Sequence, residues 1–394
     1  MASSDSPLNL EHGGPALEPD LTSTSTRRAV SLGAWRSDGA ARWLFIWPAV
    51  LLILFLSIFP LVASVVLSVS RVAFKGGGVD LSFVGLTSYN QLLFGTERVH
   101  FLGLLKNPNP LGWAFVIAVA AFVGWRIRRA ATGGIRPVFL LLRVLGALAA
   151  VVFAFYLAQA LMSDGGRPGA VIVTIFFVVV GIAVQLLIGL GLALLAVQPL
   201  PFRRFFRVAF LIPLTITPVG IGYMFRMMTD TSKGPFEPLL VALGLRNWTW
   251  VNDPWAARIA VIIGDTWQWT PFVFIVLLAA IEGLDHEVRE AAWVDGASRW
   301  QSFVHITVPA ILPVTTTIVL IRMIEGFKII DMPNILLGGG PGTATQSLTL
   351  ESYLDWNTLN LGRSAAIAYL LLILVSVIAT AYVSLVRQRV TEVV

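Results

Sequence analysis

Residues 169–197 read GAVIVTIFFVVVGIAVQLLIGLGLALLAV and contain no charged side chain. A helix needs about 20 consecutive, mostly apolar residues to cross the hydrocarbon core of a bilayer, which is about 30 Å thick. This stretch exceeds that length without interruption by a charge or a proline. It therefore predicts a membrane-spanning helix near the middle of the chain.

Other stretches of similar length and hydrophobicity lie on both sides of it. The weakest is 111–128, because Arg126 and Arg128 end it early, and a short or re-entrant segment is the alternative there. The parity of the other spans and the charge pattern favour a full crossing. We predict an all-α membrane protein of about eight spans, at 43–70, 111–128, 137–161, 169–197, 205–228, 257–281, 309–330 and 364–386.

The composition supports the same fold class. Of the 394 residues, 56% are hydrophobic and 13% are charged, about half the charged share of a soluble domain. With a mean hydropathy of +0.80, the chain has too few polar groups to cover a soluble surface. The chain contains no cysteine, which excludes disulfides, thiol catalysis and cysteine-ligated metals.

The distribution of arginine predicts the orientation in the membrane. Short arginine-rich loops remain in the cytoplasm, so the net charge of +6 indicates orientation rather than binding to nucleic acid. The polar residues 1–42 are predicted to be a disordered cytoplasmic tail, followed by an uncleaved first span. With both termini cytoplasmic, every short cluster falls on one side: Arg126, Arg128, Arg129 and Arg136, then Arg203, Arg204 and Arg207, then Arg387 and Arg389.

The predicted cytoplasmic loop 282–308 is too long for a tight turn. Its sequence predicts two short helices joined at Gly296, whose missing side chain allows a sharp bend. Pro309 then opens the next span, since a proline at a helix start loses no hydrogen bond. Such a helix–turn–helix on one face of the membrane suits docking onto a partner protein.

The loop contains Glu290, Ala291 and Ala292, then Gly296 four residues later, and then Ile306 and Pro309. This pattern resembles the EAA loop of binding-protein-dependent ABC import permeases. The flanking sequence is similar to the carbohydrate, maltose-type branch, and the resemblance covers about 43–95 and 170–386. Val308 stands where the usual leucine precedes the proline. The matching residues are Glu290, Ala291, Ala292, Gly296, Ile306 and Pro309 in the loop, with Trp267–Phe272, Asp295–Ala297, Gly338–Gly342 and Thr345, and Phe83–Leu86 with Tyr89.

The resemblance implies an inner-membrane permease subunit of a bacterial or archaeal importer. Its partners would be a second permease subunit, two ABC ATPase subunits and an extracytoplasmic solute-binding protein, with lipid around the spans. Glu290 and Gly296 would couple the chain to an ATPase, and Ala291, Ala292 and Asp295 would support the packing. The solute would be a sugar or a sugar-like molecule such as an oligosaccharide, polyol or glycoside.

The sequence departs from the six-span core of this family between the first span and 169–197. Residues 98–168 intervene and supply two additional spans. The predicted organisation is therefore a tail at 1–42, the first span with an outer loop at 43–97, the insert at 98–168, and the permease core at 169–394. The core carries the coupling loop 282–308.

Ionisable residues inside spans are costly, so they tend to pair or to line cavities. Arg322, Glu325 and Lys328 follow one helix face, where Glu325 can pair with either neighbour. This face either borders the solute path or forms a self-neutralised structural group. The sequence leaves both readings open.

Asp265, Trp267, Gln268 and Trp269 form a second polar group in the sixth predicted span. A carboxylate, an amide and indole rings suit a sugar, because polar groups bind hydroxyls and ring faces cover C–H surface. The alternative is that Asp265 pairs with Arg226 or Arg258. Tyr223 and Met224 are weaker candidates for the solute path.

No catalytic chemistry is recognisable. The sequence has no Gly-Lys dipeptide, hence no phosphate-binding loop of its own, and its four histidines lack the spacing of metal ligands. We expect no cofactor, no metal and no enzymatic activity in the chain alone. The alternatives to a permease subunit are an ion-coupled secondary transporter and a membrane scaffold without transport activity.

Overall fold

The computed structural model describes residues 43, 46–75, 77–131, 137–163, 167–198, 201–228, 230, 234–235, 237–242, 244 and 252–390. The predicted tail at 1–42 lies outside the described residues. The chain divides into two compact units, 1–61 and 62–394. The first predicted span is an apolar helix over Ile46–Ser68, which includes a π-helical segment, Leu54–Ile58, followed by α2 (Phe59–Ser68).

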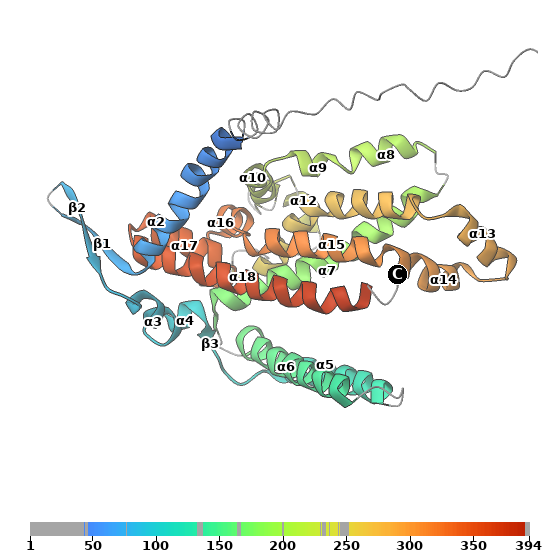
Figure 1. The fold of residues 1–394 in the computed structure, drawn as a ribbon, viewed down its shortest axis with the longest axis horizontal. Helices are drawn as coiled ribbons and strands as arrows, with labels where there is room; N and C mark the ends of the chain where they lie inside the picture. The colour runs from blue at the N-terminus through green and yellow to red at the C-terminus, as the bar shows by residue number, and fades with distance from the viewer. Residues whose placement is uncertain are drawn as a thin grey trace, which may run out of the picture. The chain divides into compact units, whose positions relative to one another are not determined.

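Four long helices form the core of the unit 62–394 (Figure 1): α7 (Ala170–Val197), α12 (Pro254–Glu282), α15 (Val308–Phe327) and α18 (Leu361–Val390). Helices α7 and α12 approach closely because Gly189 has no side chain; a Cβ there would lie 2.7 Å from Val273. Since lipid is as apolar as these residues, close packing stabilises the contact. One buried cluster joins α7, α12 and α15: Ala193, Val273, Phe274, Leu277, Leu278, Ile281, Ile311 and Ile318.

Helices α5 (Pro110–Ala131) and α6 (Pro137–Leu161) lie side by side (Figure 1). The part of α5 from Pro110 to Arg129 is long and apolar enough to cross a membrane, so it is no short segment. Six helices among the described residues reach that standard. Helix α6 is not one of the six, because only Ala150–Leu161 is identified there, as a shorter apolar helix. The described residues therefore support a multi-span fold without establishing the predicted total of eight.

The predicted span at 205–228 is broken in the structure. The chain there forms α8 (Arg203–Ala209), α9 (Ile212–Thr215) and α10 (Pro218–Met228), with a bend of 98° between the part ending at Thr215 and α10. Pro218 causes the break, because it has no N–H and disfavours helical geometry in the residues before it. Ile216, two residues before Pro218, is extended, with ψ of 138°. If the bent pair is one span, seven segments among the described residues are long and apolar enough to cross a membrane.

Short elements connect the helices. Strands β1 (Ser70–Lys75) and β2 (Gly78–Phe83) form an antiparallel hairpin, with Val72 opposite Leu81. Strand β3 (Gly103–Leu104) pairs with β4 (Arg167–Pro168), and this pair joins the ends of the α5–α6 hairpin to the core. The remaining connections contain α3 (Thr87–Leu93), α4 (Arg98–Phe101), α11 (Glu237–Ala242), α16 (Asp331–Leu337) and α17 (Leu348–Asn357).

Candidate functional site

The loop after α12 is a bent pair of helices, α13 (His286–Val294) and α14 (Arg299–Ser302), here called the elbow. Asp285 caps α13 by accepting a hydrogen bond from the Glu287 N–H at 3.0 Å. Ser298 and Gln301 form a reciprocal cap at the start of α14. A π-helical segment, Phe303–Thr307, then leads into α15, so the elbow connects α12 and α15 directly. Figure 1 shows it at the opposite end of these helices from α16 and α17.

Gly296 provides the bend, as the sequence predicts. Its φ is +76°, a left-handed conformation that side chains disfavour, and a Cβ there would meet nothing within 4 Å. The requirement for glycine is therefore a matter of backbone conformation and not of space. The Ala297 N–H donates to the Ala292 carbonyl at 2.9 Å, which closes the turn.

The elbow presents carboxylates and large apolar side chains together. Glu290, Ala291 and Asp295 are exposed, whereas Ala292 is buried and Ile306 and Pro309 are half-buried. Trp293 is 65% exposed, Val294 87% and Trp300 71%. Exposed aromatic side chains grouped with charges are typical of a surface that docks another protein. A hollow of about 350 Å³ lies between Asp295 and Ile306.

A buried polar cluster lies between three core helices. Arg322 of α15 donates from Nη2 to Asp265 Oδ2 of α12 at 3.0 Å, and from Nε to Gln185 Oε1 of α7 at 2.8 Å. Gln185 Nε2 closes the triangle by donating to Asp265 Oδ2 at 2.7 Å. The Arg322 guanidinium also lies 4.2 Å from the ring centre of Trp269. The charges are thus paired and hydrogen-bonded, which their burial requires.

This cluster corrects the pairings expected for Asp265. Asp265 bonds to Arg322 instead of Arg226 or Arg258. Arg226 donates to the Ile335 carbonyl at 3.1 Å, and Arg258 donates to the Ala344 carbonyl at 3.0 Å. The three residues predicted to share one helix face do not form one group. Arg322 belongs to the buried cluster, whereas Glu325 pairs with Lys328 at 2.7 Å in a partly exposed position.

The other predicted solute-path residues are not brought together at one place. Tyr223 is 55% exposed on α10, and Gln268 is buried. Trp267 packs against Phe225 and borders an apolar groove of about 690 Å³ between α7, α12 and the α8–α9 segment. The hydroxyls of Thr266 and Thr270 are buried beside this groove and have no hydrogen-bond partner among the described residues.

Sequence reasoning missed Gln185. Its signal was present, because apart from Thr174 it is the one strongly polar side chain in the uncharged stretch 169–197. Gln185 is fully buried and contacts both charged members of the cluster. An amide alone in an apolar span indicates a partner on a neighbouring helix.

Comparison with known proteins identifies relatives of the chain. Residues 116–392 match the family described as the binding-protein-dependent transport system inner membrane component. The trehalose/maltose transport system permease protein MalF of Thermococcus litoralis is 32% identical over 217 residues, 55% of this chain and 74% of that protein. The lactose transport system permease protein LacF of Rhizobium radiobacter is 27% identical over 55% of this chain and 74% of that protein.

A solved structure shares the fold. It is the crystal structure of a bacterial ABC transporter involved in the import of the acidic polysaccharide alginate. One of its chains is matched with a TM-score of 0.59 and 17% identity, over 90% of this chain and 99% of that one. At this identity the likeness concerns the architecture.

Proposed function

This chain belongs to the family of inner-membrane components of binding-protein-dependent transport systems, and from that premise we propose that it is the permease subunit of an ATP-driven importer. It works with a second permease subunit, two ABC ATPase subunits and an extracytoplasmic solute-binding protein. ATP hydrolysis takes place in the ATPase subunits. The observation that carries the proposal is the elbow, which presents Glu290 beside exposed tryptophans at one end of the core helices.

The elbow is suited to transmit a movement of the ATPase to the spans. Its exposed apolar residues, Trp293 and Trp300, supply a docking area, and Glu290 supplies a charge for basic partner residues. Helices α12 and α15 continue directly from its two ends. Asp265 and Arg322 join the same two helices inside the bundle, so a displacement of the elbow moves both helices together.

The solute is proposed to be a sugar or a sugar-like molecule, an oligosaccharide, polyol or glycoside. The support is that relatives carry trehalose/maltose, lactose and sulfoquinovosyl glycerol in their names. Within this chain the groove is lined by the indole ring of Trp267 and by Thr266 and Thr270, whose buried hydroxyls have no hydrogen-bond partner among the described residues. We place the solute path there and assign Asp265, Gln268, Trp269 and Arg322 to the support of α12, since Asp265, Gln268 and Arg322 are buried and Trp269 stacks on the Arg322 guanidinium.

The elbow end is proposed to face the cytoplasm. Arg207 lies at this end, where it forms an ion pair with Glu282, and Arg128 and Arg129 lie in the last turn of α5, at the end of that helix away from β3. Arginine at these positions follows the positive-inside rule. The organisation into a tail at 1–42, a first span with its loop at 43–97, an insert at 98–168 and a core at 169–394 remains part of this proposal.

Mass spectrometry of the complex purified gently from native membranes tests the assembly. The expected result is co-purification of an ATPase, a second permease and a solute-binding protein, with uptake that stops when the ATPase is deleted. Recovery of the chain alone, together with uptake driven by protons or sodium in the ATPase-deleted strain, would support the secondary-transporter alternative. Recovery of the chain alone, without any uptake activity, would support the alternative of a membrane scaffold without transport activity.

A further inference from the structure

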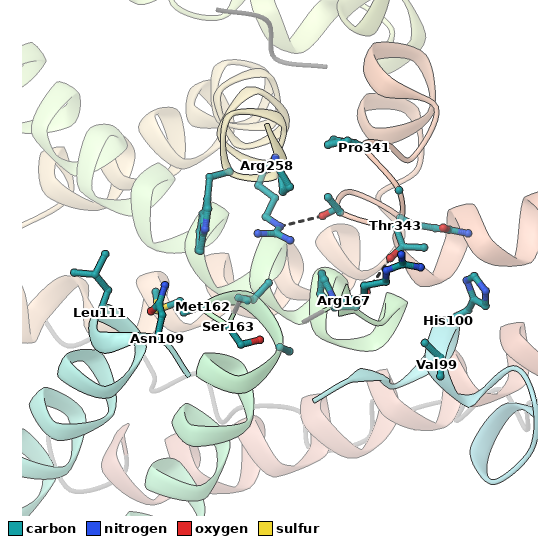
Figure 2. A pocket seen from close by; sticks show the side chains of 18 residues that line it. Val99, His100, Asn109, Leu111, Met162, Ser163, Arg167, Arg258, Pro341 and Thr343 are labelled. Atoms are coloured by element: carbon teal, nitrogen blue, oxygen red, sulfur yellow. Dashed lines mark hydrogen bonds between the residues drawn. The ribbon is translucent and has the colours of Figure 1, made fainter. Parts of the chain in front are cut away.

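A cavity of about 1040 Å³ lies where the α5–α6 hairpin meets the core (Figure 2). Its core wall comes from the start of α12 and the turn at 341–346, and its other wall from the ends of α5 and α6, from β4 and from α4. The apolar spans α5, α7 and α12 all begin at this level, at Pro110, Ala170 and Pro254. The cavity therefore lies at the depth where spans meet the lipid headgroups.

Arg258 is a buried cation in the core wall. Its residue is 2% exposed, its guanidinium lies 5.0 Å from the ring centre of Trp255, and its Nε donates to the Ala344 carbonyl at 3.0 Å. The two terminal nitrogens donate to no residue that the structure describes, although the side chain lines the cavity. An immobilised guanidinium with unused donors is suited to bind a planar or tetrahedral oxyanion.

Arg167 is held beside the same turn. Its backbone pairs with Leu104 in the β3–β4 ladder, and Thr343 Oγ1 donates to the carbonyl of the next residue, Pro168, at 3.2 Å. Thr343 and Ala344 are consecutive. The same turn of the chain therefore holds the backbone next to Arg167 and the side chain of Arg258. His100 also lines the cavity, and Figure 2 shows it on the same side as Arg167.

The charged side chains that the structure describes in the lining are all basic. None of the lining residues that the structure describes is acidic, and neither arginine forms an ion pair within the described part of the chain. Two neighbouring carboxylates lie outside the lining. Asp253 accepts from the Ala256 N–H at 2.7 Å and its charge also acts on Arg258, and Glu351 accepts from Gln346. The wall that carries Arg167 also includes the apolar side chains of Val99, Leu111, Leu161 and Met162.

We propose that this cavity binds a phosphate group, with Arg258 and Arg167 as its ligands, and that the group belongs to the headgroup of an anionic phospholipid. The headgroup depth, an arginine in each wall and the apolar side chains beside Arg167 together match an anion attached to an acyl chain. The cavity volume exceeds what a free phosphate ion needs and suits a headgroup with the first part of its chain. Lipid bound there bridges the α5–α6 hairpin and the core.

Native mass spectrometry of the full complex, exchanged into an equal mixture of phosphatidylglycerol and phosphatidylcholine, tests the site. We expect retained phosphatidylglycerol, with affinity about tenfold lower in Arg167→Gln and Arg258→Gln, as the loss of a charge-assisted hydrogen bond predicts. Arg71→Gln, on the β1–β2 hairpin, is the matched control and should bind as the unaltered complex does. Because Arg167 is exposed, its variant tests the site even if Arg258→Gln does not fold.

A second measurement distinguishes the source of the phosphate. Inorganic phosphate and glycerol 3-phosphate are titrated into the delipidated complex while its thermal midpoint is followed. Stabilisation that depends on Arg167, without selective lipid retention, assigns the site to a soluble phosphate compound. If neither phosphatidylglycerol nor the soluble phosphates distinguish Arg167→Gln from Arg71→Gln, the proposal is overturned.

Discussion

Arg322 Nη2 lies 3.0 Å from Asp265 Oδ2, and this ion pair joins α15 to α12 deep inside the bundle. Arg322 is 1% exposed, and its Nη1 is buried without a partner among the described residues. Gln185 and Trp269 contact the same guanidinium from α7 and α12. The pair therefore connects three helices inside the bundle. Each of its two buried charges is compensated by the other.

Removing one partner of this pair should destabilise the protein strongly. Arg322→Gln or Asp265→Asn leaves a buried charge uncompensated, at a cost of about 3–5 kcal/mol. The double variant Asp265→Leu with Arg322→Met should recover most of the loss, because no charge remains. The thermal midpoint of the purified complex checks both. The control is Lys328→Gln, which breaks an exposed pair worth about 0–1 kcal/mol. Equal midpoints for single and double variants would contradict the coupling.

The location of the spans could be predicted from sequence, because the length of an apolar run directly reflects membrane thickness. The hydrogen-bond partner of Asp265 could not be predicted from the sequence. Hydropathy gives the depth of a residue along its own helix and leaves open which neighbouring helix it faces, so the arginines of α10 and α12 were as plausible as Arg322. The break near Thr215 was not predicted, although Pro218 is visible in the sequence.

The elbow shows which part of a functional site sequence can predict. The bend at Gly296 and the two short helices follow from local residue preferences, and both are present. The groove beside Trp267 could not be foreseen, because it is bounded by α7, α8–α9 and α12, which meet only in the folded chain. The lack of a hydrogen-bond partner for the Thr266 and Thr270 hydroxyls among the described residues has no signature in the sequence of a single helix.

Glu290→Ala should strongly reduce solute uptake while leaving the chain in the membrane. Glu290 lies on the exposed side of α13, so its replacement leaves the core packing unchanged and removes a charge for the ATPase. We expect at least about a tenfold fall in uptake and less ATPase recovered with the complex, as loss of a charged docking contact predicts. Glu287→Ala, one turn earlier on the same helix, is the matched control. Equal loss in both variants would indicate a general charge effect instead of a specific coupling residue.

Gly296→Ala should weaken coupling through the backbone alone. A left-handed conformation costs an L-residue about 1–2 kcal/mol, and the space around Gly296 is open. The elbow should therefore lose its bend, which lowers ATPase binding and uptake together. Gly191→Ala provides the control: it has equally open space in α7 but no left-handed φ, so it should not reduce stability. Normal uptake by Gly296→Ala would contradict the proposal that the bend at Gly296 is needed for coupling to the ATPase.

The orientation is open to a clean labelling experiment because the chain contains no cysteine. Val294→Cys places a thiol on the elbow and Val79→Cys places one on β2, at 87% and 62% exposed positions. A membrane-impermeant maleimide should label Val79→Cys in intact cells. It should label Val294→Cys only in inverted vesicles from which the peripheral subunits have been removed. The reverse pattern would invert the proposed topology and separate the elbow from any cytoplasmic ATPase.

Glu351 should make stability depend on pH. It is 6% exposed on α17, outside the spans, and burial raises its pKa above the ordinary value of 4.5. Asp355 and Glu97 raise this pKa further, whereas Arg363 and His100 lower it. A carboxyl whose pKa is raised by folding contributes stability fully below pH 4.5, and this contribution is lost as the pH rises through the folded pKa.

Glu351→Gln removes this titration while keeping the size of the side chain. The variant should match the unaltered protein near pH 4.5 and become progressively more stable than it as the pH approaches 8, on the order of 1 kcal/mol per unit of raised pKa. Thermal midpoints across this range measure the difference. Glu287→Gln, at an exposed position, should show no such trend. A difference that stays constant with pH would mean that Glu351 is already fully ionised in the folded protein, held so by Arg363.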